Sequence, residues 1–482
     1  MDEATSRRAA LAAAARDIFE AGLSAVDPRA AVAAALQRHG DVLVLSDPLR
    51  GEQRARYRLG DYHRLLVVGA GKAGAPMAGA VEDLLGDRLE GGLVIVKHGH
   101  TDRGAAKPTG ASSCLVELVE AGHPLPDQAG LDATCRLIEL LRGADAQTLL
   151  LCVISGGGSA LLTAPAGEVS LDDLRRVTDA LLAAGADIRA FNTVRKHLSA
   201  LKGGQLARLA APATVATLVL SDVIGDPLDA IASGPTVPDP TTFSAARDAL
   251  RRAQIWDDDV ALPSAVRAHL EAGLAGEVPE TPGPRDPAFE RCTTALVGNN
   301  RLAVAACERR AQQIGWPTLA LTSTLEGEAA DVGRMLGSIA REALEVGRPQ
   351  RPPLCVICGG ETTVSLGGDG HAVGRGGRNQ ELALAAALAL DGLPPAICLL
   401  SAGTDGTDGP TDAAGALAFD DTLSRARACG LDAAAQLQDH DAYPFFDALG
   451  DLLRTGPTGT NVMDLQLLLI AEASPREGAP AR

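Results

Sequence analysis

A glycine-rich turn at residues 69–74 carries the pattern in this chain that is best suited to chemistry. Gly69, Gly71 and Gly74 match the spacing G-x-G-x-x-G, which can hold a phosphate on backbone N–H groups at a helix N-terminus. Lys72 stands inside the turn, and because no Ser or Thr follows it, the turn is not a P-loop. The turn therefore predicts a lysine and N–H groups presented to an anion. A tight turn with an exposed lysine is the alternative.

A second polar turn, Ser-Gly-Gly-Gly-Ser, follows an apolar run that ends at residue 154. Its consecutive N–H groups and two hydroxyls suit a carboxylate or a phosphate. A serine nucleophile is disfavoured, because the pattern G-x-S-x-G would need glycine where Leu161 stands. The candidate binding residues of this loop are Ser155, Gly156, Gly157, Gly158 and Ser159.

A dense group of cations lies at residues 189–202 of this acidic chain. Arginine, lysine, asparagine and histidine are the residue types that grip an oxyanion, so the segment is a candidate anion site. A solvated helix face is the alternative. The candidates in this segment are Asn192, Arg195, Lys196, His197 and Lys202.

Two arginines of the second half, Arg375 and Arg378, follow a glycine hinge and open a predicted helix. Guanidinium groups at such a place can stabilise charge in phosphoryl transfer. Asp405 and Asp408 stand on a glycine-rich turn after a strand and are candidates to hold Mg²⁺ directly or through water. A CxxC pair at residues 355–358 lies within a strand and has no second pair, so we expect it to pack in the core.

Short apolar runs alternate with longer helical patterns along the chain, which predicts an α/β protein with a mostly parallel sheet. In such sheets ligands bind at the carboxyl ends of strands, where the polar turns above stand. The expected strands are 65–68, 93–96, 114–119, 148–154, 214–220, 293–297, 317–322, 354–358, 396–400 and 465–470. The expected helices are 6–22, 27–40, a helix that ends at 85, 131–141, 171–184, 300–314, 328–346 and 380–390.

Length and composition restrict the classes of protein to consider. At 482 residues the chain is long enough for two or three domains. The net charge of −17 argues against nucleic acid or an anionic membrane as a partner. Nine scattered cysteines, no signal-peptide pattern and no apolar run long enough to span a bilayer predict a cytoplasmic protein.

A proline-rich stretch at residues 277–284 predicts a domain boundary, because the alternation of strands and helices restarts beyond it. We therefore expect an N-terminal Rossmann-like α/β domain at residues 1–276. A second α/β domain is expected at residues 285–473.

Eight segments together resemble the glycerate 2-kinase family, whose C-terminal half is the MOFRL domain. They cover the chain from about residue 60 to residue 470 in the family's order. The matching segments are 69–73, 155–161, 192–199 with 202–204, 221–226, 232–236, 359–364, 377–381 and 403–416.

The resemblance implies a two-domain enzyme with its active site in the cleft between the domains. It implies ATP and Mg²⁺ as cofactors and transfer of the γ-phosphoryl group to the C2 hydroxyl of D-glycerate, giving 2-phosphoglycerate. It also implies that four residues are essential: Lys72, Asp222, Arg378 and Asp405.

We expect Lys72 and Arg378 to stabilise the transferring phosphoryl group and the substrate carboxylate. Asp222 would accept the hydroxyl proton or order the metal, and Asp405 would hold Mg²⁺. Substrate or ATP binding is expected of the loop and basic candidates above and of Gly69, Gly71, Glu361, Arg375, Asn379 and Asp408.

Two other functions are open at this point. The first is an NAD(P)H-dependent hydroxypyruvate reductase, and hydroxypyruvate reductase is also an older name used within the family. Such an enzyme would use the 69–74 turn, with Lys97 and His98 facing a 2′-phosphate of the cofactor. No His–Arg–acid set for hydride transfer is evident, which counts against it. A non-catalytic anion-binding protein is the other alternative. For partners we expect D-glycerate and ATP, no nucleic acid and no membrane, with a homodimer as an open alternative.

Overall fold

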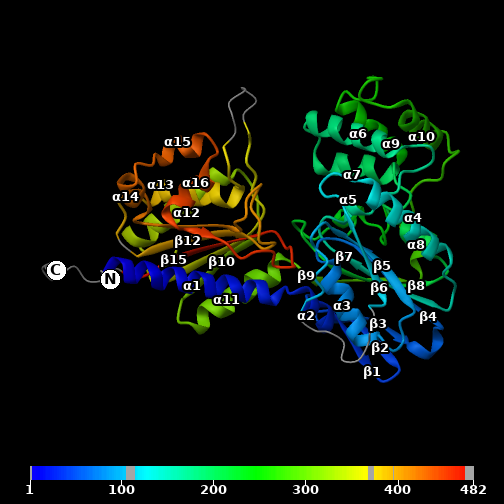
Figure 1. The fold of residues 1–482 in the computed structure, drawn as a ribbon, viewed down its shortest axis with the longest axis horizontal. Helices are drawn as coiled ribbons and strands as arrows, with labels where there is room; N and C mark the ends of the chain where they lie inside the picture. The colour runs from blue at the N-terminus through cyan, green and yellow to red at the C-terminus, as the bar shows by residue number, and fades with distance from the viewer. Residues whose placement is uncertain (1–2, 105–113, 367–373, 395, 473–482) are drawn as a thin grey trace, which may run out of the picture. The chain divides into compact units, whose positions relative to one another are not determined.

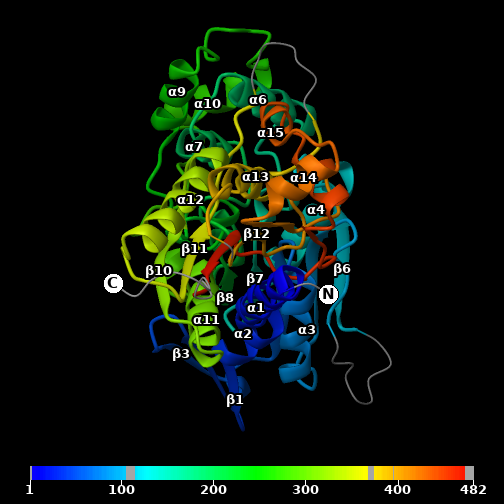
Figure 2. The same cartoon turned by 90° about the vertical axis from the view of Figure 1, so that its left-hand side faces the viewer.

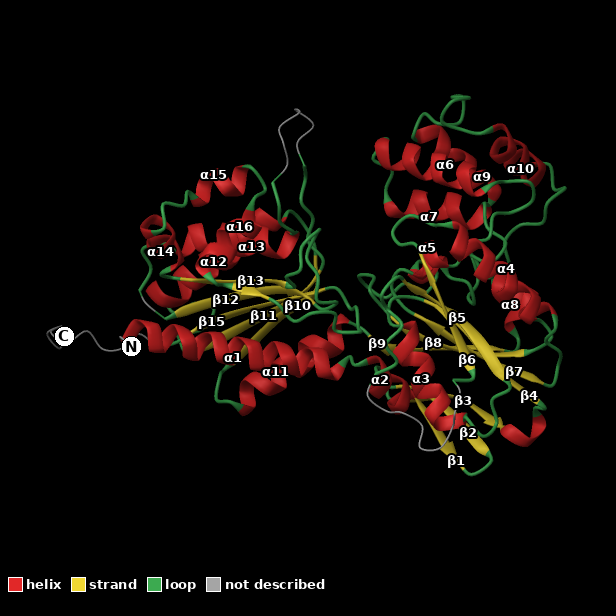
Figure 3. Cartoon of the chain, in the orientation of Figure 1, coloured by secondary structure: helices red, strands yellow, loops and turns green. Residues whose placement is uncertain are grey.

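The computed structural model describes residues 3–104, 114–366, 374–394 and 396–472 (Figure 1). The chain divides into two compact units. One unit consists of residues 27–299, and the other combines residues 1–26 with residues 300–482. Each unit is built on a β-sheet that carries helices on its faces (Figure 3). Both units are therefore α/β, as the sequence predicts.

A six-stranded parallel sheet forms the centre of the 27–299 unit (Figure 3). The strand order is β6-β5-β4-β7-β8-β9, and each neighbouring pair is parallel. Helices and a small sheet cover its two faces, so β7 and β8 are buried along their whole length and read as continuous apolar runs. The strands are β4 (Arg64–Ala70), β5 (Gly91–Lys97), β6 (Val116–Ala121), β7 (Thr148–Ile154), β8 (Thr214–Leu220) and β9 (Cys292–Gly298).

Different elements cover the two faces of this sheet. Helices α4 (Gln128–Arg142) and α8 (Gln205–Ala210) pack on one face, where Leu137 and Leu206 join the core. The other face meets α2 (Pro28–Ala35), α3 (Gly74–Leu85) and a three-stranded antiparallel sheet. The strands of that small sheet are β1 (Leu36–His39), β2 (Val42–Asp47) and β3 (Glu52–Arg58).

A group of helices in the same unit (Figure 1) has a hydrophobic core of its own, and Phe191, Leu250 and Trp256 are among its buried side chains. These helices are α6 (Leu171–Ala183), α7 (Ile188–His197), α9 (Phe243–Arg252) and α10 (Ser264–Leu274). Ser170 and Asp173 form a capping box at the start of α6, so this helix begins at residue 171, as expected. The short helices of the unit are η1 (Leu59–Asp61), α5 (Gly158–Leu161), η2 (Ile231–Ser233) and η3 (Pro287–Phe289).

The other unit contains a six-stranded mixed sheet of order β10-β11-β15-β12-β13-β14. Strand β15 runs antiparallel between β11 and β12, so those two strands end at the same edge. The strands are β10 (Thr318–Leu325), β11 (Leu354–Gly360), β12 (Ile397–Gly403), β13 (Gly415–Phe419), β14 (Leu452–Leu453) and β15 (Asp464–Ile470).

Helices lie on both faces of this mixed sheet as well. The first helix, α1 (Glu3–Ala25), packs with α11 (Asn300–Gln313) on one face (Figure 2). The opposite face carries α12 (Ala329–Glu345) and α13 (Arg378–Leu390), whose apolar side chains form the main core of the unit. Three shorter helices lie on that second side (Figure 3): α14 (Thr422–Ala428), α15 (Ala433–Gln438) and α16 (Ala442–Leu449).

The division into units differs from the predicted one at both ends. Strand β9 lies beyond the proline-rich stretch at 277–284, yet it pairs with β8 and completes the first sheet. Helix α1 belongs with the C-terminal half, where Asp17 forms an ion pair with Arg310 on α11 at 2.8 Å. The differences arise because strand pairing and helix docking join segments that are distant in the sequence, which local composition does not report.

Further differences concern short elements and one sheet. The stretch expected as a single helix at 27–40 is α2 followed by β1, and β2, β3, β13 and β14 were not predicted. The mostly parallel sheet is confirmed for the 27–299 unit, whereas the second sheet is mixed. Cys355 and Cys358 are buried unpaired thiols in β11, as expected for core packing. In the part of the chain that the structure describes, no helix is long and apolar enough to span a bilayer.

Candidate active site

Three turns that carry predicted site residues meet at one edge of the parallel sheet. The turns after β4, β7 and β8 contain Lys72, Ser155 and Asp222. These strands are direct neighbours, and the carboxyl ends of parallel strands lie at the same edge of a sheet (Figure 3). The fold therefore brings together groups that lie up to 150 residues apart in the sequence.

The glycine turn after β4 is packed tightly against β7. Gly69 and Gly71 have φ angles of 157° and 143°. A Cβ atom on Gly69 would lie 2.0 Å from the carbonyl oxygen of Val153, and one on Gly71 would lie 2.0 Å from Oγ of Ser155. These glycines are thus required by the close packing of this segment against β7 and the turn that follows β7. That requirement differs from the approach of a dinucleotide pyrophosphate, which the same spacing serves elsewhere.

Hydrogen bonds of the backbone fix the position of Lys72. Its N–H donates to the carbonyl oxygen of Gly156 at 2.8 Å, and the next N–H, of Ala73, donates to Oγ of Ser155 at 3.0 Å. The carbonyl oxygen of Lys72 lies 3.1 Å from Nδ1 of His100. A cation on a backbone held this way is pre-organised, so it loses little freedom on meeting an anion.

A chain of hydrogen bonds joins α7 to the glycine loop after β7. Nη1 of Arg195 donates to Oγ of Ser159 at 3.2 Å, and this hydroxyl lies 2.8 Å from Oγ of Ser233. The Ser233 hydroxyl donates to Oδ1 of Asn192 at 3.2 Å. Burial lowers the pKa of Arg195 to about 10, which leaves the guanidinium charged at neutral pH. Arg195 and Asn192 are thus the members of the basic segment whose side chains join this hydrogen-bond chain to the loop.

Two neighbours of Arg195 on α7 turn into the protein interior. Nζ of Lys196 lies 3.2 Å from a carboxylate oxygen of Asp239 and 3.3 Å from one of Asp229. The ring of His197 packs edge-on against Phe243 at 4.7 Å between centroids. These contacts join α7 to the segments around it, so both side chains stabilise the fold where they stand.

Lys202 is also buried, in the turn before α8. Its ammonium group donates a hydrogen bond to the carbonyl oxygen of Leu162. Burial, together with the positive charge of Arg195, lowers the pKa of Lys202 to about 7. Near neutral pH this lysine is therefore only partly charged.

Asp222 lies half-buried directly after β8. On one side, the hydroxyl of Ser221 donates to the carbonyl oxygen of Val223 at 3.3 Å. On the other side, Nδ2 of Asn299 donates to Oδ2 of Asp226 at 2.6 Å. The loop that carries Asp222 is thus anchored on both sides.

In the other unit, two carboxylates hold Arg378, the first residue of α13. Its Nε and Nη2 donate to the two carboxylate oxygens of Asp464 at 2.6 and 2.9 Å, and its Nη1 lies 2.7 Å from Oε1 of Glu361. The Asp464 side chain is fully buried, whereas that of Arg378 is 34% exposed. Burial alone would lower the pKa of Arg378, but the Asp464 hydrogen bonds and the charges of both carboxylates raise it above its ordinary value.

Strand β15 explains how Asp464 reaches Arg378. Asp464 begins this antiparallel strand and is paired with Gly360 on β11 and with Gly403 on β12. Its carboxylate therefore lies at the edge where β11 and β12 end. Glu361 and Asp405 follow those two ends, so the strand order brings three acidic residues to the edge where Asp464 binds Arg378.

Asp408 and Asn379 form a buried cap at the start of α13. Oδ1 of Asp408 accepts hydrogen bonds from the backbone N–H and from Nδ2 of Asn379 at 3.1 and 3.2 Å. Oδ2 of Asp408 accepts from the N–H of Gln380 at 2.9 Å. Burial raises the pKa of Asp408 to about 6, against the effect of these donors. Asn379 and Asp408, both expected to bind substrate or ATP, thus bind each other and orient the helix end that carries Arg378.

The described part of the predicted hinge is anchored. The N–H of Gly374 donates to the carbonyl oxygen of Asp439, and that of Arg375 donates to Oδ1 of Asp441, both at 2.8 Å. The Arg375 guanidinium stacks over the ring of Tyr443 at 4.0 Å. Residues 367–373 lie outside the described residues. Where it is described, the segment is a docked loop, because its N–H groups are bonded to the α15–α16 connection.

The acidic turn after β12 carries Asp405, the residue expected to hold Mg²⁺. Oδ1 of Asp405 accepts from the N–H and the hydroxyl of Thr407 at 3.0 and 2.9 Å. A Cβ atom on Gly403 would lie 3.6 Å from Oδ1 of Asp405 and 3.4 Å from Oδ1 of Asp464. The described residues contain no group of three or more His, Cys, Asp or Glu side chains arranged to hold a metal ion. Mg²⁺ is commonly held by one or two carboxylates with substrate phosphates, and this donor set fits that mode.

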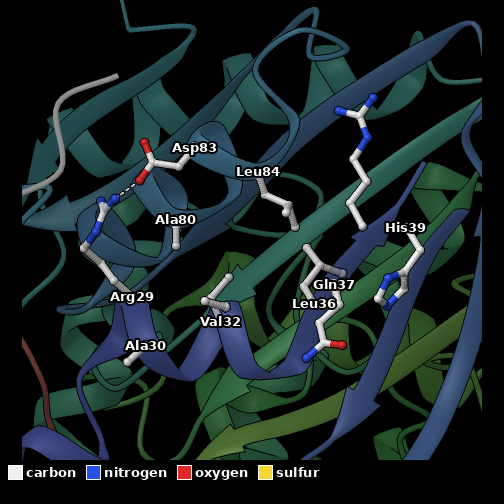
Figure 4. A pocket seen from close by; sticks show the side chains of 11 residues that line it. Arg29, Ala30, Val32, Leu36, Gln37, His39, Ala80, Asp83 and Leu84 are labelled. Carbon is white, nitrogen blue, oxygen red and sulfur yellow. Dashed lines mark hydrogen bonds and ion pairs between the residues drawn. The ribbon is translucent and has the colours of Figure 1, made fainter. Parts of the chain in front are cut away.

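A cavity of about 590 Å³ opens elsewhere in the 27–299 unit, between α2, β1 and α3 (Figure 4). Val32, Leu36 and Leu84 line it, and the ion pair of Arg29 with Asp83 lies at its rim (Figure 4). It contains none of the predicted site residues, so it is not the candidate active site.

Comparisons with known proteins cover most of the chain. Two family models match the chain: a domain of unknown function (DUF4147) over residues 14–271 and the MOFRL family over residues 354–464. A glycerate 2-kinase of Pyrococcus horikoshii is 42% identical over 407 residues, which cover 84% of this chain and 87% of that protein. The solved structure of a glycerate kinase from Thermotoga maritima is 37% identical and covers 96% of this chain and 100% of that one, with a TM-score of 0.79. The chain belongs to the glycerate 2-kinase family with a C-terminal MOFRL domain.

The older name of the glycerate 2-kinase family also occurs among these relatives. A protein of Agrobacterium vitis with the provisional name hydroxypyruvate reductase is 42% identical over 455 residues, which cover 94% of this chain and 93% of that protein. The geometry of this chain does not favour dinucleotide binding at the 69–74 turn. The space at Gly71, where a pyrophosphate would approach, is occupied by the side chain of Ser155.

Three residues of this family member belong to the candidate site although the sequence pattern did not single them out. Ser233 lies in a segment that carries the family resemblance, and its φ of 59° is unusual for a residue other than glycine. Asp464 begins a long apolar strand, where a lone charge is the only signal. His123 stands in a proline-rich loop and approaches Gly157 in the folded protein. Each gains its role from a partner far away in the sequence.

Proposed function

We propose that this chain is an ATP-dependent glycerate 2-kinase that phosphorylates D-glycerate at its C2 hydroxyl. The observation that carries the proposal is the positively charged edge of the parallel sheet, where Lys72 and Arg195 flank the glycine loop. Lysine, arginine and successive backbone N–H groups are suited to a small carboxylate and to phosphate groups. The family relationship supports the same substrate class.

In the proposed reaction the C2 oxygen forms a bond to the γ-phosphorus atom of ATP. The bond from that phosphorus to the β–γ bridging oxygen breaks, and ADP leaves with this oxygen. We assign the proton of the C2 hydroxyl to the carboxylate of Asp222, which lies at the strand end beside the loop at 155–159. The products are 2-phosphoglycerate and ADP.

Charge stabilisation is the main catalytic contribution that we assign to the cations. A loose phosphoryl transition state spreads negative charge over its equatorial oxygens, and cations fixed near those oxygens lower the barrier. Lys72 is fixed by the contact between two turns, and Arg378 by a two-pronged ion pair. We assign binding of the substrate carboxylate to Arg195 and the N–H groups of the glycine loop.

Mg²⁺ would neutralise charge on the nucleotide phosphates when it is bound. We propose Asp405 as its protein ligand, with the remaining positions filled by water and phosphate oxygens. Glu361 and Asp464 have a different task in this assignment, because both already bind Arg378. A cytoplasmic location is part of the proposal, and the nine cysteines support it because none forms a disulfide.

A coupled assay tests the proposal directly. Purified protein is supplied with ATP, Mg²⁺ and D-glycerate, and enolase reports 2-phosphoglycerate without a mutase. We expect formation of ADP with an enolase signal of equal size. A signal that requires added phosphoglycerate mutase would indicate transfer to the C3 hydroxyl. Oxidation of NADPH by hydroxypyruvate without release of ADP would establish the reductase instead.

A further inference from the structure

His123 lies beside the glycine loop, although its own position follows β6, two strands away from β4. A Cβ atom on Gly157 would lie 3.0 Å from Cδ2 of His123, 3.1 Å from its Nε2 and 3.5 Å from Cγ of Lys72. The imidazole and the lysine stem therefore flank the same glycine. The His123 side chain is half-buried, so its ring is open to a ligand of that loop.

Neither ring nitrogen of His123 has a hydrogen-bond partner among the residues that the structure describes. The neighbouring histidines do have partners. Nε2 of His98 lies 3.2 Å from Oδ2 of Asp127, and Nδ1 of His100 lies 3.1 Å from the carbonyl oxygen of Lys72. A polar ring that a bound substrate covers must be paired by that substrate, because an unpaired buried group costs free energy.

Basic side chains face His123 from three elements. Lys72 follows β4, Lys97 and His100 lie at and after the end of β5, and Arg195 lies on α7. Burial, reinforced by these charges, lowers the pKa of His123 to about 4. The ring is therefore neutral at physiological pH, with one nitrogen that accepts a hydrogen bond. Lysine and arginine have donors only, so His123 can supply the acceptor that a substrate hydroxyl needs in these surroundings.

The two hydroxyls of D-glycerate have different requirements in the proposed reaction. The C2 hydroxyl loses its proton, so its partner must be able to take that proton. His123 is unsuited to this task, because the positive charge that the ring would gain with the proton would face the cations around it. The C3 hydroxyl keeps its proton and needs only an acceptor.

We propose that His123 is a specificity-determining residue that accepts a hydrogen bond from the C3 hydroxyl of D-glycerate. This inference rests on the proposed function, because it takes D-glycerate as the substrate. It assigns the choice between glycerate and its 3-deoxy analogue, D-lactate, to one side chain. The carboxylate and the C2 hydroxyl, which both molecules share, are left to the other residues of the edge.

The test compares D-glycerate with D-lactate in the wild type, His123→Phe and His123→Gln. Steady-state kinetics give kcat and KM, and titration calorimetry without ATP gives the two dissociation constants. We expect His123→Phe to lower kcat/KM for D-glycerate roughly 10–100-fold, mainly through KM, because one hydrogen bond to a buried group is lost. The values for D-lactate should stay within about threefold. His123→Gln keeps a neutral acceptor and should restore most of the preference.

His63→Phe is the matched control. His63 is exposed and precedes β4, at the opposite edge of the same sheet. This variant should keep the wild-type ratio of the two substrates. Circular dichroism of each variant checks that the fold is retained.

The possible results separate the inference from the proposed function. Equal losses for both substrates in His123→Phe, or a His123→Gln variant that matches His123→Phe, would overturn the inference. A wild type that binds D-glycerate more tightly than D-lactate but forms no ADP would overturn the kinase proposal. In that case, loss of the binding preference in His123→Phe still supports the role of His123. A wild type that shows no preference for D-glycerate over D-lactate, in binding or in turnover, would also overturn the inference.

Discussion

The two charged regions of the molecule, the edge around the glycine loop and the start of α13, surround their cations with groups of opposite charge: other cations in the first and carboxylates in the second. At the edge after β4 and β7, positive groups gather around His123 and the glycine loop and lower the pKa of that histidine. At the start of α13, Arg378 is gripped by Asp464 and Glu361, and its pKa is raised. The first region is thus a positive surface made of several groups, whereas the second is one arginine balanced by two carboxylates.

This difference suggests a division of labour between the regions. An accumulation of positive charge favours an anionic substrate in its ground state. An arginine that is already paired gains less from a ground-state anion, since the anion must compete with Asp464 for its donors. Such an arginine is held in a fixed orientation and can act on charge that develops during the reaction. Four experiments test this comparison.

Removal of Arg378 should have the largest effect. Arg378→Ala should lower kcat about 10³–10⁵-fold, by analogy with arginine fingers, with a much smaller change in KM. Arg378→Lys should also fail, because an ammonium group cannot reproduce the planar fork toward Asp464. Steady-state kinetics on both variants, with folding checked by circular dichroism, make the measurement. If Arg378→Ala keeps kcat within about threefold of the wild type, the role passes to Arg375 or Arg195.

Removal of Lys72 should have the next largest effect. We expect Lys72→Met to lower kcat about 10²–10³-fold, as loss of a single fixed donor does, with a smaller change in KM. Lys72→Arg is the matched variant that keeps the charge and should retain part of the activity. The same kinetics and ADP release measure both. A Lys72→Met variant that changes KM alone would show that Lys72 binds the substrate in its ground state, and would contradict the role in the transition state that we assign to it.

Substitution of Asp464 tests whether the balance at Arg378 matters. Asp464→Asn removes one charge and one acceptor of the fork, so Arg378 should lose its orientation and kcat should fall about 10–100-fold. Glu361→Gln is the control, because that ion pair is partly exposed and should contribute much less. Thermal unfolding monitors the stability of both variants. Equal losses of kcat in Asp464→Asn and Glu361→Gln would show that the buried carboxylate of Asp464 orients Arg378 no more than the partly exposed carboxylate of Glu361 does.

The smallest effect concerns the cost of burying the ammonium group of Lys202. Burial and the charge of Arg195 lower the pKa of Lys202 to about 7, below its value of 10.5 in an unfolded chain. The unfolded state then holds more protons across this interval, so the contribution of Lys202 to stability rises as the pH increases from about 7 to about 10.

Comparison of Tm between the wild type and Lys202→Met measures this contribution. The difference in Tm, wild type minus variant, should increase by about 2–5 °C between these pH values. The subtraction removes titrations that both proteins share. A difference that stays constant with pH would contradict a lowered pKa at this lysine.

The elements that carry the site could be predicted because their signals are local. Strands such as 148–154 and 214–220 are buried on both faces, so their apolar runs coincide with β7 and β8. The turns at their carboxyl ends were visible as glycine-rich and polar sequence. On α7, the helical spacing put Asn192 near both Arg195 and Lys196. Only Asp239, far along the chain, decided that Lys196 turns inward.

The sequence by itself determined the alternation of strands and helices and the polar turns at the strand ends. It also carried the resemblance to a family of glycerate kinases. These features follow from periodicity and turn chemistry over a few neighbouring residues. The tertiary structure decided which groups meet. Strand β9 completes the first sheet, β15 carries Asp464 between β11 and β12, and the loop after β6 brings His123 to Gly157. Strand order and direction depend on the packing of whole elements, which no local pattern in the chain encodes.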